Sequence, residues 1–92
     1  MKFMSTWTVV PGTLNEAAHR FLAGLAAPPE GVTHLGRWHK ADCSGGFVLF
    51  ETTNPVAIYE SAALFADVLE IHTVPVVEDA EAGPVLAKVF QK

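Results

Sequence analysis

Apolar and polar residues alternate along the chain with two different periods, and each change of period marks a new element. Residues 2–10 are rich in β-branched and aromatic types and stop at a Pro-Gly pair, which predicts a strand followed by a turn. From there the apolar positions recur at helical spacing as far as Leu25. Thr13 followed by Glu16 is typical of a capping box, and the prolines and glycine of segment 26–31 end the predicted helix.

The second half of the chain repeats this alternation of elements. Two strands joined by a short polar loop predict an antiparallel hairpin, and Asn54 before a proline predicts the N-cap of a second helix. A Gly-Pro pair is expected to delay or kink the last helix. The predicted elements are strands over 32–39 and 46–52, a helix from 55 to 66, a strand over 67–77 and a helix over 79–90.

This order of elements predicts an α+β fold. It is the ferredoxin-like βαββαβ pattern with an extra carboxyl-terminal helix, and residues 1–92 form a single domain. One sheet results, with its helices on one face. The other face, called the open face below, must then be polar or covered by another molecule.

The composition favours an open face that is covered by another molecule. Half of the residues are hydrophobic and 17% are charged, which is apolar for a chain of 92 residues with a small core. An apolar patch on the open face is too large to leave in water, so we expect a homodimer formed through that face.

Charge and hydropathy exclude other partners and predict a location. The net charge is −4 and the six Lys and Arg residues are scattered, which argues against nucleic acid. No stretch approaches the roughly 20 apolar residues of a membrane span. The amino terminus lacks the pattern of a signal peptide and Cys43 is the single cysteine, so a cytoplasmic protein is expected.

Strand periodicity predicts which side chains face the helices. If His39 lies opposite Gly46, then His34 lies opposite Glu51. Leu35, together with Val48 and Phe50, then faces the helices, and Arg37 and His39 edge this patch at the rim. The open face is predicted to carry His34, Gly36, Trp38, Phe47, Leu49, Glu51, Glu70, His72 and Val74, with Thr6 and Thr8 from the first strand.

The open face is also the predicted place of a site. A chamber that a second subunit closes would be half apolar, with a few polar groups converging on it. His34 and Glu51 are the candidate catalytic pair, an imidazole base and its orienting carboxylate. The carboxylate would raise the pKa of the imidazole, whereas burial would lower it. The predicted substrate-binding residues are Trp38, His72, Thr6, Thr8, Phe47 and Leu49.

Each of these residues also has a purely structural interpretation. A buried His-Glu pair can simply satisfy its own hydrogen bonds inside a dimer core, and large aromatic side chains are first of all core material. The spacing of the four histidines and Cys43 contains no metal-binding motif, so neither a metal nor a cofactor is predicted. His34 and His72 would form part of a metal site only if folding or dimerisation brought them together.

Five stretches carry a resemblance to a known family: FMSTWTV, PPEGV, LGRWH, GGFVLFET and HTVPVVEDAEAGPVLAKVF. In this order they resemble small bacterial proteins classed as domain of unknown function 3303, over nearly the whole chain. The resemblance implies a dimeric α/β barrel, in which two ferredoxin-like sheets face each other. The wider group of such barrels includes cofactor-free monooxygenases, isomerases, haem-degrading enzymes and stress-responsive proteins, so the fold alone implies little about function.

Two functions follow as expectations. The first is a small-molecule-binding barrel, in its catalytic form a cofactor-independent enzyme, monooxygenase-like or isomerase-like, acting on a small and largely apolar substrate. The alternative is a non-catalytic structural or interaction module whose dimer core is filled by side chains.

Overall fold

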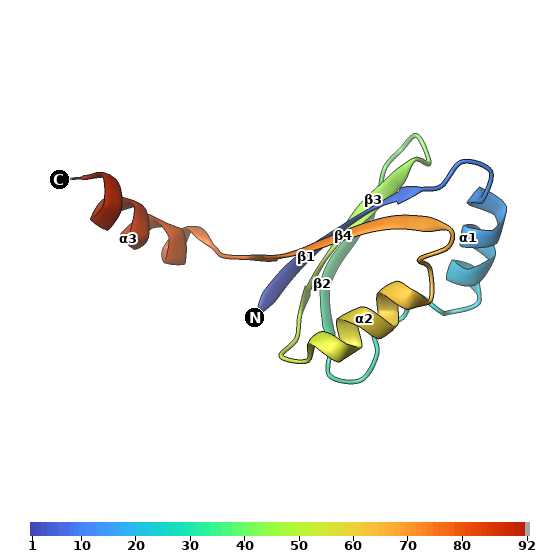
Figure 1. The fold of residues 1–92 in the computed structure, drawn as a ribbon, viewed down its shortest axis with the longest axis horizontal. Coiled ribbons are helices and arrows are strands. Elements are labelled where there is room, and N and C mark those ends of the chain that lie inside the picture. Colours follow the sequence, from blue (N-terminus) through green and yellow to red (C-terminus); the bar gives the residue numbers. More distant parts are fainter. Residues whose placement is uncertain (92) are drawn as a thin grey trace.

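A computed structural model describes residues 1–91 of the chain and contains the predicted order of elements. Four antiparallel strands form one sheet in the order β2-β3-β1-β4, and α1 and α2 lie on the same side of it (Figure 1). The fold is α+β and ferredoxin-like, with an additional carboxyl-terminal helix. The elements are β1 (Lys2–Val9), α1 (Leu14–Leu22), β2 (Thr33–His39), β3 (Gly45–Glu51), α2 (Pro55–Ala63), β4 (Leu69–Val76) and α3 (Asp79–Phe90).

The ends of α1 differ from the prediction. Thr13 is the N-cap, but its side chain makes no capping hydrogen bond, so the predicted capping box is wrong. The Thr13 hydroxyl is placed within hydrogen-bond distance of two carbonyl oxygens instead, those of Val10 and Val68. The helix ends before Leu25, because Gly24 adopts a φ of +89° and the backbone N–H groups of Gly24 and Leu25 close back onto the last turn.

The caps of the other two helices explain where those helices begin. The Asn54 side chain accepts a hydrogen bond from the Val56 N–H at 3.0 Å, which confirms the predicted cap of α2. A reciprocal capping box joins Glu78 and Glu81 at the start of α3. This cap opens α3 at residue 79, so the later Pro84 lies inside the helix and does not delay its start.

The register predicted for the hairpin of β2 and β3 is confirmed at the turn end and wrong at the other end. His39 lies opposite Gly46 and Gly36 lies opposite Leu49, as predicted. A β-bulge at Leu35 then inserts one residue, so His34 lies opposite Phe50 and the predicted pairing of His34 with Glu51 is wrong. The extra residue moves His34 from the open face to the helix-facing side of the sheet, and Leu35, predicted to face the helices, is 44% exposed.

The core between helices and sheet is small. Ala17, Phe65 and Val68 are buried together, with Ala26, Leu69 and Ile71 partly buried around them. No large side chain is fully buried among residues 1–91. The helices therefore do not close tightly onto the whole sheet, and this leaves room for the chamber described below.

A charged clamp connects α1 to the segment that follows α2. Arg20 donates hydrogen bonds to both carboxylate oxygens of Asp67, at 2.6 and 2.8 Å, and to Glu16 at 3.0 Å. The guanidinium lowers the pKa of Asp67 to about 2, mainly through these hydrogen bonds. The folded state therefore favours the ionised form of Asp67.

We expect Asp67→Asn to destabilise the fold at neutral pH and to leave it nearly unaffected in acid. Because the folded pKa lies below the ordinary 3.8, the contribution of Asp67 is complete above about pH 4 and disappears as the pH falls to about 2. Thermal melts of the natural chain and the variant should differ at pH 7 and converge only as the pH falls below about 2, where Asp67 is protonated in the folded state as well. Glu60→Gln is the control, since Glu60 is exposed on α2 and makes no ion pair within residues 1–91. A difference between the two chains that stays as large below about pH 2 as at pH 7 would contradict the ionic explanation.

Candidate functional site

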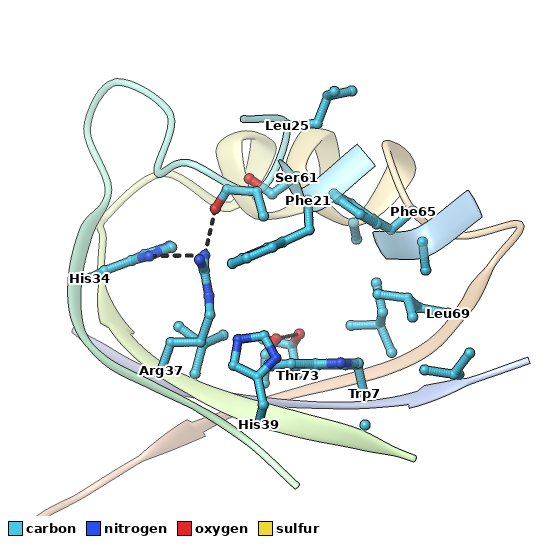
Figure 2. A pocket seen from close by; sticks show the side chains of 18 of the residues that line it. Trp7, Phe21, Leu25, His34, Arg37, His39, Ser61, Phe65, Leu69 and Thr73 are labelled. Carbon is cyan, nitrogen blue, oxygen red and sulfur yellow. Dashed lines mark hydrogen bonds between the residues drawn. The ribbon is translucent and has the colours of Figure 1, made fainter. Parts of the chain in front are cut away.

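A chamber of about 320 Å³ lies between the two helices and the sheet (Figure 2). Side chains of all four strands form its floor and wall, and side chains of α1 and α2 cover it. Most of the lining is apolar, from residues that include Leu14, Phe21, Leu25, Val48, Phe50, Ile58, Phe65, Leu69 and Ile71. The polar lining comes from Ser5, Ser61, Thr73, His34, Arg37, His39, Lys40 and Cys43.

Arg37 and His34 occupy one wall of the chamber. Both come from β2, and the bulge at Leu35 is what gives residues 34 and 37 the same face. The Nη2 atom of Arg37 donates to the Ala26 carbonyl and contacts Nδ1 of His34 at 3.2 Å. The guanidinium also lies 5.5 Å from the ring centre of Phe21, so three neighbours hold it in place (Figure 2).

Burial and the Arg37 contact together favour the neutral form of His34. Burial lowers the pKa of His34 from its usual 6.5, and the positive charge of Arg37 lowers it further. His34 is therefore a neutral imidazole at pH 7. Because a guanidinium can only donate, Nδ1 accepts from Arg37 and the ring proton sits on Nε2. The prediction that a carboxylate partner would control this pKa is wrong, since the charged neighbour is a cation.

Aromatic rings shape the opposite part of the chamber. The ring of His39 meets Trp7 and Phe21 edge to face, with centroid distances of 5.5 and 5.3 Å. On the floor the hydroxyls of Ser5 and Thr73 hydrogen-bond to each other across β1 and β4. The arrangement suits a flat, apolar molecule with a polar edge directed at β2.

The other predicted site residues lie on the opposite side of the sheet. Thr6, Thr8, Trp38, Phe47, Leu49 and His72 share the open face, as their phase in the strands predicted. Their role in substrate binding stays a prediction. His34 faces the helices, so it does not meet His72 within one chain.

Glu51 and His72 have other partners than those considered from the sequence. The Glu51 carboxylate lies 3.9 Å from the Lys2 ammonium, which also pairs with Glu78. Nε2 of His72 lies 3.0 Å from the carboxylate of Glu70 on the same strand. Both pairs are exposed to solvent, so each is a weak interaction in this chain.

Sequence reasoning missed several chamber residues. The sequence allowed a binding role for Arg37 and Trp7 but favoured the rim of a core for Arg37 and the core for Trp7, and Phe21, Ser5 and Thr73 were not predicted as site residues. The period of β1 does place Ser5 and Trp7 on one face, but nothing in the period shows that α1 stands away from the sheet there. Among residues 1–91, no three metal-binding side chains gather in one place. Within the same range, no helix is long and apolar enough to cross a membrane.

Comparisons with known proteins place the chain in context. The model of a family described as "Domain of unknown function (DUF3303)" matches residues 1–90. No curated protein matches the chain in sequence.

Two solved structures share the fold. One is 5-chloro-2-hydroxyhydroquinone dehydrochlorinase (TftG) from Burkholderia phenoliruptrix AC1100, in complex with 2,5-dihydroxybenzoquinone. It has a TM-score of 0.58 and 16% identity, over 88% of this chain and 98% of that one. The other is Rv0793 from Mycobacterium tuberculosis, with a TM-score of 0.52 and 10% identity, over 86% of this chain and 97% of that one. Identities this low show the fold alone, which is the ferredoxin-like α/β barrel fold.

Proposed function

This chain belongs to the family of the domain of unknown function DUF3303, and we propose that it binds a small, largely apolar molecule in the chamber between its helices and its sheet. The observation that carries the proposal is the convergence of His34 and Arg37 on a largely apolar cavity of about 320 Å³. Cavities of this size and character are the usual sites of small-molecule ligands. The proposal moves the ligand from the open face to the helix side of the sheet.

The catalytic form of this proposal is a cofactor-independent enzyme, monooxygenase-like or isomerase-like. Both reactions begin when a base removes a proton from the substrate, and His34 is a neutral imidazole suited to that step. Arg37 would stabilise the negative charge that then develops on the substrate. The dehydrochlorinase of the same fold, whose structure holds 2,5-dihydroxybenzoquinone, gives a precedent for a small ring compound as ligand.

The alternative is a structural or interaction module with a filled core. The chamber argues against it, because an interior that served only stability would be packed to higher density.

A blocked chamber tests the proposal. We expect 2-naphthol, an uncharged aromatic probe at pH 7, to bind the natural chain with a Kd of about 0.1 mM and to quench tryptophan fluorescence. Ala62→Phe places a ring in the chamber and should weaken binding at least about tenfold, a loss of about 1.4 kcal/mol. Ala63→Phe is the matched control, since Ala63 is the next residue of α2 and is exposed outside the chamber. Equal weakening by both variants, or binding unchanged in Ala62→Phe, would refute this location.

We further propose a homodimer formed through the open face. Helices α1 and α2 lie on the other side of the sheet (Figure 1). Within residues 1–91 neither of them covers Trp38, Phe47 or Val74. Trp38 and Val74 are 52% and 54% exposed. Exposed apolar side chains gathered on one face of a sheet mark an interface. The resemblance seen in the sequence implies a dimeric α/β barrel, so a second copy of this chain is the partner that we propose.

The last helix supports the same proposal. Helix α3 extends away from the body of the chain, at the end of the β4 ribbon (Figure 1). Leu86 and Phe90 are 55% and 76% exposed, and none of the α3 residues is buried. We infer that α3 packs on the second subunit, where its apolar side chains leave water.

A further inference from the structure

Arg37, the cation on the wall of the chamber, has no counter-ion among residues 1–91. Arg37 and Lys40 line the chamber, and among residues 1–91 no Asp or Glu does, although the chain contains 10 acidic and 6 basic residues. Arg37 makes no salt bridge within residues 1–91, whereas Arg20 on α1 pairs with both Glu16 and Asp67. The chamber is therefore positively charged in a protein of net charge −4.

The hydrogen bonds of Arg37 leave part of its guanidinium free. Nη2 donates to the Ala26 carbonyl and to His34, and within residues 1–91 neither Nε nor Nη1 donates to any group. The hydroxyls of Ser5 and Thr73 on the floor pair with each other, and none of the polar side chains that line the chamber is an acid. A cation next to apolar side chains is stabilised when an anion accompanies it. Phe21 lies against the guanidinium, and the unpaired Nε and Nη1 atoms are not buried, so a molecule that enters the chamber can reach them.

We propose that the ligand of this chamber is an aromatic anion, a carboxylate or a phenolate whose charged oxygen meets Arg37. This inference rests on the proposed function and specifies the chemical class of its ligand. The rings of Trp7, Phe21 and His39 contact the flat part of the molecule, and the free Nε and Nη1 donors meet its oxygen atoms.

A matched pair of probes tests the inference. 2-Naphthoate and 2-naphthamide have nearly the same shape and differ in charge. At pH 7 and low salt, calorimetry should show naphthoate binding at least about tenfold more tightly to the natural chain. Arg37→Gln removes the charge but keeps a polar side chain, so it should abolish this preference. Arg37→Lys should retain most of the preference.

The controls separate this inference from the proposed function. Arg20→Gln removes the same charge outside the chamber and should leave the preference intact. Equal binding of both probes to the natural chain would overturn the inference that the ligand is an anion. The proposal that the chamber binds a ligand would still hold. Binding of neither probe would count against the chamber itself. A preference that survives in a folded Arg37→Gln chain would show that Arg37 is not the counter-ion. Should that variant fail to fold, the ratio in the natural chain and its decline with salt still decide the question.

Discussion

The Phe47→Asp variant is expected to be a monomer at concentrations where the natural chain is a dimer. Phe47 lies on β3, contacts Trp38 on the open face and is 38% exposed in the single chain. A carboxylate at this position would be buried without a partner in each half of the interface, which should weaken association at least about 100-fold, or about 2.7 kcal/mol. Light scattering at micromolar concentration should give about 20 kDa for the natural chain and 9.9 kDa for the variant.

A second variant and a shortened form of the protein make this test specific for the open face. Tyr59→Asp makes the same kind of substitution on α2, where Tyr59 is 78% exposed on the other layer, and should leave the mass unchanged. A chain that ends at Val77 lacks α3 and should dimerise more weakly than the natural chain. If Phe47→Asp stays dimeric while the shortened chain is a monomer, α3 alone forms the interface and the open face does not. A natural chain that weighs 9.9 kDa at these concentrations would rule out the dimer altogether.

Replacing Gly45 with alanine should lower the free energy of unfolding by about 3 kcal/mol or more, because the added methyl group has no space. A Cβ atom on Gly45 would lie 1.9 Å from the Trp7 carbonyl oxygen. That oxygen belongs to β1, the strand that pairs with both β3 and β4, so the backbone cannot move aside without disturbing two strand pairings. Urea denaturation should show the loss as a shift of the midpoint, and the chamber should lose its ligand together with the fold.

Gly83→Ala is the control for this substitution. Nothing lies within 4 Å of a Cβ atom placed on Gly83, and this residue is inside α3. Alanine should therefore be neutral or stabilise the helix by about 0.5–1 kcal/mol. Similar losses for both variants would show that the close approach to Trp7 does not explain the effect.

Part of the candidate site follows from strand period alone. Residues two apart in a strand share a face, so Arg37 and His39 are correctly placed on the helix side and Trp38 on the open face. The same rule places His72 on the open face, because β4 runs without a bulge. The role of His34 could not be read in this way. One extra residue at Leu35 reverses the faces of everything beyond it. The local sign of this bulge is Gly36, the next residue of the strand, but a glycine does not by itself fix where the extra residue lies.

The sequence by itself determined the order of elements and the ferredoxin-like pattern, because helix and strand periods and the residues that end them are local properties. It also determined the family. The tertiary structure decided which groups meet. His34 reaches Arg37 because of a bulge, and Glu51 pairs with Lys2 across β1 and β3. Among residues 1–91, Arg37 meets no acid. Such contacts depend on how far α1 stands from the sheet and on register at single positions. Neither the distance of α1 from the sheet nor the register at a single position changes the hydrophobic period of the sequence. Only the packed structure could therefore place a cation and a neutral imidazole in one chamber.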